Sequence, residues 1–204
     1  MRLGIPAMLQ QVFISLGSVV LQRLINGFGT YVIAAYTAAS KIDGFATMPA
    51  INLGKAISNF VAQNKGADQP ERIKNGLFAT LAIGVSVALL ITLIVIIFGQ
   101  PLMLMFNRNL EVVRIGYQYL IIVSIFYFLF TMMQILNGFL LGLGKVFMPM
   151  LATITSFCLI QVPVAAILSS KIGVNGIWIA SPIGWMVGMI FRLISAKKEY
   201  KMLL

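Results

Sequence analysis

The chain has 204 residues, of which 60% are hydrophobic and 10% charged, and its mean hydropathy is +0.98. Soluble domains are about 45–50% apolar and about 25% charged, so this composition excludes a soluble globule, a disordered chain and a collagen-like fibre. The net charge of +10 comes from 15 Lys and Arg against 5 Asp and Glu. These bases lie between apolar runs, which indicates the cytoplasmic face of a polytopic membrane protein rather than a nucleic-acid-binding protein.

Six apolar runs follow one another along the chain. A bilayer core of about 30 Å needs about 20 apolar residues in a helix. The runs cover residues 5–25, 31–53, 77–98, 112–141, 147–168 and 174–194. We interpret the first as a true span rather than a cleaved signal peptide. The sequence therefore predicts an all-α integral membrane protein, a single six-transmembrane-helix bundle over residues 1–204.

The basic residues divide unequally between the two sides of such a bundle. An even number of spans puts both termini on one side. That side holds ten bases: Arg2, Lys55, Lys65, Arg72, Lys74, Lys145, Arg192, Lys197, Lys198 and Lys201. The other side holds four: Arg23, Arg108, Arg114 and Lys171. The positive-inside rule then predicts that both termini are cytoplasmic, and Trp178 suits the aromatic belt at one interface.

Residues that could do chemistry are few. The chain contains no histidine, which excludes a Ser-His-Asp triad, a Cys-His dyad and a His-ligated metal site within it. Its one cysteine, Cys158, lies in an apolar run and favours a small buried side chain. No GxxxxGKS/T phosphate loop is present, and no GxGxxG motif follows a strand. We therefore expect no enzyme activity, no catalytic residues, no metal site and no cofactor.

Polar side chains recur inside three of the runs at helical spacing. Since a helix turns by about 100° per residue, each set lies on one helix face. The sets are Gln11, Ser15, Ser18, Gln22 and Asn26, then Tyr36, Ser40, Asp43 and Thr47, then Ser124, Tyr127, Thr131 and Gln134. Three polar faces in one bundle favour a hydrated cavity or a translocation path, with the first face as its lining. The alternative, favoured for any single Ser or Thr, is hydrogen bonding between helices.

Lys41 and Asp43 are the two charges deep within a predicted span. Two residues apart on a helix, they point about 200° away from each other and cannot pair directly. Each needs another partner, a water-filled cavity, or a local break that Gly44 and Pro49 could supply. Because ionisable groups within a membrane mark functional sites, both are ion-coupling candidates, and Asp43 is the better one. A structural charge bonded to its neighbours is the alternative.

Several short motifs bear a family likeness. They are Gly4-Ile5-Pro6, Gly29 with the alanine-rich stretch that follows it, Met48-Pro49, Gly54, Gln63-Asn64-Lys65-Gly66-Ala67 with Glu71-Arg72, and Gly138 to Lys145 with Pro149. With these motifs nearly the whole chain resembles the multidrug and toxic compound extrusion (MATE) family. The Lys41/Asp43 pattern and the expected cytoplasmic amino terminus resemble its carboxy-terminal six-helix lobe.

This resemblance implies secondary antiport, in which drugs or organic cations leave in exchange for H⁺ or Na⁺ between two six-helix lobes. It also implies a second lobe as partner, from a missing amino-terminal half or a second copy. One departure concerns the acidic cation ligands that some branches carry in the first and fourth helices of this lobe. The first run has no acid, and Glu111 only borders the fourth, so those ligands are not carried over.

The hypothesis from sequence is thus a half-transporter lobe. Its expected cavity lining is Gln11, Ser15, Ser18, Gln22, Asn26, Tyr36, Ser40, Tyr127, Thr131 and Gln134. The aromatic rings of Tyr36 and Tyr127 could stack on a cationic drug. The alternatives are a flippase-like exporter of lipid-linked or polar metabolites, and an accessory or scaffold subunit without transport. In the flippase alternative Lys41 is the only deep base, since Arg23 and Arg192 are near span ends.

Overall fold

The structure is a computed structural model that describes residues 4–202, and the side chains of residues 8–200. Arg2 and the side chain of Lys201, two of the ten bases counted above, lie outside this part. Every element within it is helical, as predicted. The helices are α1 (Gly4–Asn26), α2 (Thr30–Gly66), α3 (Pro70–Phe106), α4 (Leu110–Ser124), α5 (Tyr127–Gly142), α6 (Phe147–Thr153), the π-helix η1 (Ile154–Gln161), α7 (Val162–Ile172) and α8 (Val174–Met202).

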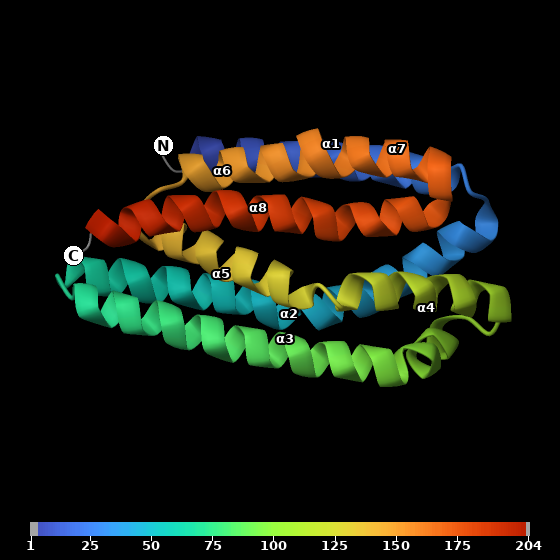
Figure 1. The fold of residues 1–204 in the computed structure, drawn as a ribbon, viewed down its shortest axis with the longest axis horizontal. Coiled ribbons are helices and arrows are strands. Elements are labelled where there is room, and N and C mark those ends of the chain that lie inside the picture. Colours follow the sequence, from blue (N-terminus) through green and yellow to red (C-terminus); the bar gives the residue numbers. More distant parts are fainter. Residues whose placement is uncertain (1–3, 203–204) are drawn as a thin grey trace.

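The helices lie side by side as an elongated bundle (Figure 1). In that view α1 and the α6–α7 rod form one edge, α2 and α3 form the other, and α8 and α5 lie between them. Both ends of the described chain are at the left of the view. The α2–α3 and α5–α6 turns are close together, because the Lys65 ammonium donates to the Leu143 carbonyl at 2.8 Å. The shared end agrees with an even number of crossings.

The helices α2 and α3 are much longer than the apolar runs within them. Each has 37 residues, about 55 Å of helix, whereas a bilayer core is about 30 Å thick. The polar stretch after residue 54 continues α2, because Ile57 and Val61 on one face of it are buried. Pro70 occupies the first turn of α3, where its missing N–H costs nothing. The α2–α3 connection is therefore only three residues long.

The fourth apolar run is not one straight helix. It bends by 54° between α4 and α5. No Pro or Gly lies at the break, but the Thr92 hydroxyl on α3 donates to the Ser124 carbonyl at 2.6 Å. A carbonyl released from the helical ladder thus keeps a donor. The break sets the direction in which α5 begins, at Tyr127.

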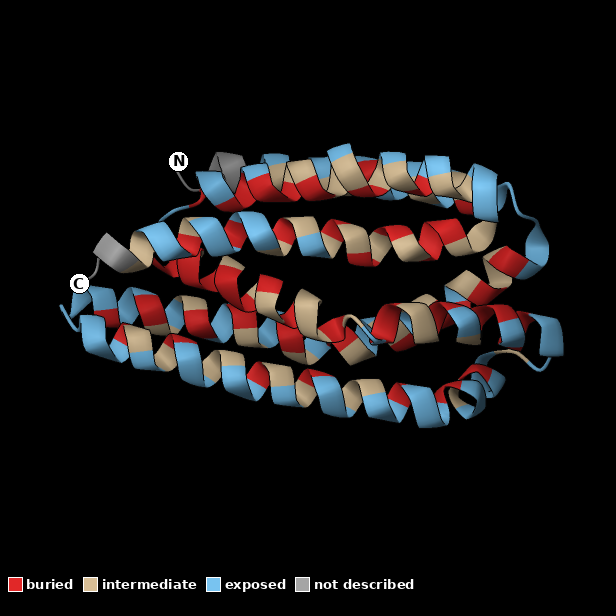
Figure 2. Cartoon of the chain, viewed as in Figure 1, coloured by how far each residue is buried: buried red, intermediate tan, exposed pale blue. Residues whose placement is uncertain are grey.

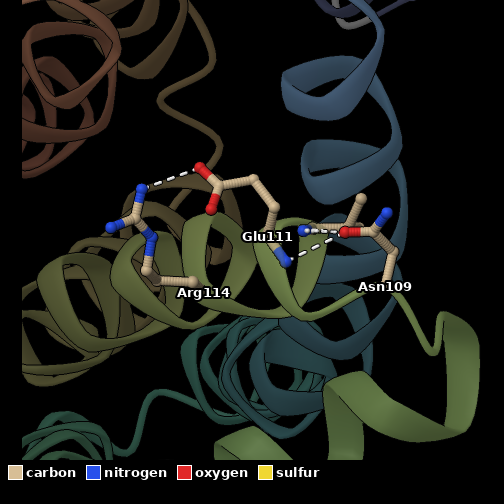
Figure 3. A network of polar contacts seen from close by, with 4 residues as sticks. Asn109, Glu111 and Arg114 are labelled. Atoms are coloured by element: carbon tan, nitrogen blue, oxygen red, sulfur yellow. Dashed lines mark hydrogen bonds and ion pairs between the residues drawn. The ribbon is translucent and has the colours of Figure 1, made fainter.

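The first turn of α4 is fixed by its own side chains (Figure 3). The Asn109 side chain accepts from the backbone N–H groups of Glu111 and Val112 at 2.9 and 3.4 Å. This is the ordinary helix cap of an Asn at the N-cap position. Arg114 forms an ion pair with Glu111 at 2.7 Å, exposed to solvent. Glu111 is therefore committed to a helix end, and it lies outside the large cavity described below.

By length and composition four helices could cross a membrane, and five if the bent α4–α5 pair is one span. The four are α1, α3, the continuous α6–η1–α7 rod and α8. The helix α2, which carries Lys41 and Asp43, does not meet this test. The prediction of six spans is therefore supported only to this extent, although residues 4–202 form six helical rods.

Burial corrects one sequence expectation directly. Trp178, predicted to lie in the aromatic belt, is only 1% exposed and belongs to the main core cluster. Its ring packs against aromatic side chains of α2 and α4 rather than facing lipid. The helix α5 is among the most buried elements, whereas α1 and α3 present broad exposed faces (Figure 2). Apolar exposure on α1 and α3 is what a helix in lipid requires.

Candidate functional site

A cavity of about 590 Å³ lies between α1, α2, α5, η1 and α8. Most of its lining side chains are apolar or neutral polar, with aromatic rings from α2, α4, α5, η1 and α8. Asp43 is the only acid and Arg192 the only base among the described residues that line it. This volume and lining fit an organic small molecule.

The carboxylate of Asp43 has a specific partner in the bundle. Tyr127, which is 2% exposed at the start of α5, donates its hydroxyl to Asp43 Oδ1 at 2.7 Å. The helix α2 runs unbroken past Gly44 and Pro49, so the local break considered above does not occur. Asp43 instead has a hydrogen-bonding partner and lines the large cavity. Lys41 is exposed on another face of α2.

Three aromatic rings pack together beside Asp43. The rings of Tyr36 and Trp178 are stacked, with centroids 5.5 Å apart. The ring of Tyr119 meets both edge-on, at 5.7 Å from Tyr36 and 5.0 Å from Trp178. All three rings line the large cavity. Edge-to-face and stacked arrangements stabilise aromatic pairs, so the three rings form one packed wall of the cavity.

The structure brings some of the predicted residues to this cavity. Ser18, Gln22, Tyr36, Asp43 and Gln134 line it. The residues come from α1, α2 and α5, the three elements that carry the polar faces. Whether they contact a substrate stays a prediction.

Other predicted residues lie elsewhere. Tyr127 and Thr131, with Thr47, border a separate void of about 10 Å³, roughly the space of one water. Gln11 and Ser15 are exposed on α1 and are absent from the cavity wall. Asn26 accepts from Gln22 at 2.9 Å, and Ser40 donates to the backbone carbonyl of Thr37 at 3.0 Å. The polar face of α1 is thus rotated, by about one residue, from the face that meets the cavity.

Sequence reasoning missed the base at the opposite end of the cavity from the rings. Arg192, counted there as a base near a span end, is 3% exposed and lines the cavity. It also missed Gln10, which lines the cavity and donates to Thr153 Oγ1 at 2.8 Å. Arg192 lies two helical turns after Trp185, which also lines the cavity. That seven-residue spacing was the available signal, because it puts both side chains on one face of α8.

Comparisons with known proteins agree with this architecture. The model of the MatE family matches residues 6–167. "Probable multidrug resistance protein YoeA" of Bacillus subtilis (strain 168) is 27% identical over 192 residues, which are 93% of this chain and 42% of the relative. A protein of Shewanella oneidensis named "FAD transporter" is 26% identical over 87% of this chain and 39% of its own length.

Solved structures show the same fold. The crystal structure of MATE in the bent conformation superposes with a TM-score of 0.91 at 20% identity, over 99% of this chain and 45% of that one. The chain thus spans about half the length of the relatives and structures that it matches. The family model covers most of the chain, and solved structures share its helical fold: the protein belongs to the MatE family of transporters.

Proposed function

We propose that this chain is one lobe of a secondary antiporter that exports drugs or organic cations across a bacterial plasma membrane in exchange for H⁺ or Na⁺. Family membership and the multidrug-resistance names of its relatives support the class of transport. A transporter of this kind works by alternating access, with two repeats moving around a site near the bilayer midplane. The cavity beside Asp43 is the candidate for this lobe's share of that site.

The environment of Asp43 is the observation that carries the proposal. Among the described residues it is the one acid that lines the cavity, and its partner is the neutral hydroxyl of Tyr127 rather than a cation. A carboxylate held in this way can take up a proton or a small cation without first breaking an ion pair. Desolvation strengthens its response to charge, because the field of a charge is larger in an apolar surrounding.

The complete site requires a second lobe in this proposal. The chain spans about half the length of its relatives. The cavity is bordered on one side by α1, and only 11% of the residues in the apolar stretch of this helix are buried. A second lobe would complete the cavity wall, as a separate half or as another copy of this chain. All six rods would then cross the membrane, with both termini in the cytoplasm.

The substrate class has two candidates. Relatives are named for multidrug resistance and, in one case, for FAD transport. The ring cluster beside Asp43 suits an organic cation, since aromatic faces attract positive charge. Export of polar metabolites, the flippase-like alternative, is favoured by Arg192 in the same cavity. The remaining alternative for the function as a whole is an accessory subunit without transport, which makes no use of a charged cavity.

The test is the neutral, isosteric substitution Asp43→Asn in cells or everted vesicles that express the protein with its second lobe. We expect gradient-driven efflux of a cationic dye to fall about ten-fold or more, because the amide cannot release a proton or bind a cation. The matched control is Asp68→Asn, an exposed acid in the α2–α3 turn. Asn tolerates the left-handed backbone of Asp68, whose φ is 53°.

The amount of folded protein in the membrane must be equal in the wild type and both variants. Unchanged efflux in the Asp43→Asn variant at that level would remove Asp43 from the coupling mechanism. Absence of any flux in the wild type, with a stoichiometric partner that co-purifies, would favour the accessory subunit.

A further inference from the structure

Arg192 on α8 is a buried cation that has no anionic partner within the described residues. It is 3% exposed, and neither of the two ion pairs in residues 4–202 includes it. The five acids of the chain lie elsewhere: Glu111 pairs with Arg114, Glu199 pairs with Lys145, and Asp43 accepts from Tyr127. Asp68 is exposed in the α2–α3 turn, and Glu71 is exposed in the first turn of α3.

Neutral acceptors hold the guanidinium in place. Its Nε donates to Asn137 Oδ1 at 3.2 Å, Nη1 to the Gly188 carbonyl at 3.1 Å, and Nη2 to Thr153 Oγ1 at 2.5 Å. The second N–H of Nη2 points to the Pro149 carbonyl at 3.5 Å. Nη1 carries two N–H groups and makes one bond, so one of the five donors is left. Three helices, α5, α6 and α8, therefore orient the group while its charge stays uncompensated.

The positive charge is costly unless an anion visits it. Removing an ion from water costs several kcal/mol even after the protein relaxes, and neutral hydrogen bonds return only part of this. A neutral side chain could bond Asn137 and Thr153 at a smaller desolvation cost. The charge has a physical use here if a carboxylate or phosphate enters the cavity and pairs with the free donor.

Space for the rest of such a molecule lies beside the guanidinium. Trp185 and Phe130 line the same cavity, with ring centroids 5.0 Å apart. Trp185 is two helical turns before Arg192, about 10 Å along α8 and on the same face. Between them Gly188 lets the guanidinium pack closely against α8, because a Cβ there would lie 3.0 Å from Arg192 Nη1.

We propose that Arg192 is an anion-binding subsite of the cavity, which holds the carboxylate or phosphate of an amphipathic substrate whose aromatic body lies on Trp185 and Phe130. The proposal rests on the proposed function and deepens it, because it assigns a substrate class to the same cavity. It adds an anionic group at one end of that cavity to the cationic preference expected beside Asp43.

Binding can be measured without transport, because Trp178 and Trp185 are the only tryptophans of the chain and both line the cavity. The chain is purified with any second lobe that accompanies it, in phosphatidylcholine nanodiscs. Energy transfer from tryptophan to pyrenebutanoate is compared with transfer to the neutral pyrenebutanol. We expect the wild type to bind the carboxylate about ten-fold more tightly than the alcohol, which is about 1.4 kcal/mol.

The Arg192→Gln substitution should reduce this preference to about two-fold or less, while Arg192→Lys should keep part of it. The matched control is Lys171→Gln, which removes one exposed positive charge at the end of α7, away from the cavity lining. It should keep the wild-type preference. A purely structural Arg192 would lower stability in the Gln variant but leave the ratio of the two affinities unchanged.

A wild type that binds both probes equally overturns the proposal, whether or not the Arg192→Gln variant folds. Equal preference in the wild type and a folded Arg192→Gln variant overturns it too. A second arm adds phosphatidylglycerol: competition in the wild type that Arg192→Gln removes supports the anion site but assigns it to a lipid phosphate instead of a substrate. Anion preference in a protein whose efflux is insensitive to Asp43→Asn would support Arg192 while contradicting the coupling role of Asp43.

Discussion

The hydrogen bond from Tyr127 to Asp43 joins residues 84 positions apart. Helical phase alone put Asp43 on the face of Tyr36, and both line the cavity. It could not find Tyr127 as the partner, because that contact depends on how α5 starts after the break. For the same reason Tyr127, expected to line the cavity, borders the separate small void instead. Arg192 was missed because it precedes a basic carboxy-terminal stretch and was counted with it as a base near a span end, although it is 3% exposed.

Replacing Tyr127 by Phe tests the Asp43 contact without creating a cavity. A hydrogen bond to a charged group contributes about 1.5–3 kcal/mol, so we expect a lower melting temperature together with slower efflux. The control is Tyr117→Phe, whose hydroxyl donates to the Ile96 carbonyl at 2.9 Å in an exposed position. That variant should lose at most about 1 kcal/mol, since water replaces the lost bond. Equal melting temperatures for both variants would mean that the Tyr127 bond contributes no more than a surface contact. Thermal unfolding in detergent measures both.

Among the elements, the helices follow from periodicity better than their limits and bends do. The apolar runs marked every rod, but α2 and α3 extend well past them, because helical hydrogen bonds do not stop where apolar residues do. The turn at residues 67–69 was foreseeable from Pro70, which opens a helix. The break between α4 and α5 was not, since its donor Thr92 comes from another helix.

The close packing of α2 against α5 gives a prediction at this scale. A Cβ on Gly138 would overlap the Gly54 carbonyl group, and a Cβ on Gly54 would lie 2.7 Å from the Gln134 carbonyl oxygen. Gly138→Ala should therefore push the two helices apart and lower stability by about 1–3 kcal/mol or more, as overpacking does. The control is Gly44→Ala in α2, where a Cβ meets nothing within 4 Å.

Because Ala is the better helix former, that control should be neutral or raise stability by about 0.5–1 kcal/mol. Melting temperatures of the purified variants decide the matter. A Gly138→Ala variant as stable as the Gly44→Ala variant would show that α2 and α5 can separate without cost.

For the molecule as a whole, the same residues that suggest function obscure the topology. By length and composition α2 does not qualify as a membrane-spanning helix, whereas α1 and α3 on either side of it in the sequence do. Its two charges near the middle do not face an apolar core, because Asp43 lines the cavity and Lys41 is exposed on the outside of this lobe. A span that borders a water-filled path needs fewer apolar residues than one surrounded by lipid. Six apolar runs along the sequence therefore predict six crossings, whereas the length and composition of the described helices support four, or five if the bent α4–α5 pair is one span.

Cysteine labelling distinguishes these two topologies. In a Cys158→Ala background, single cysteines replace Phe28, Gln69 and Arg108, which are exposed in the α1–α2, α2–α3 and α3–α4 connections. If α2 and α3 both cross the membrane, a membrane-impermeant maleimide should label the cysteines at 28 and 108 in intact cells, and the cysteine at 69 only after permeabilisation. The positive-inside rule sets this direction, because the α2–α3 turn lies at the end that carries most bases. Labelling of 28 and 69 from the same side would mean that α2 does not cross, and Asp43 would then lie outside any transmembrane path.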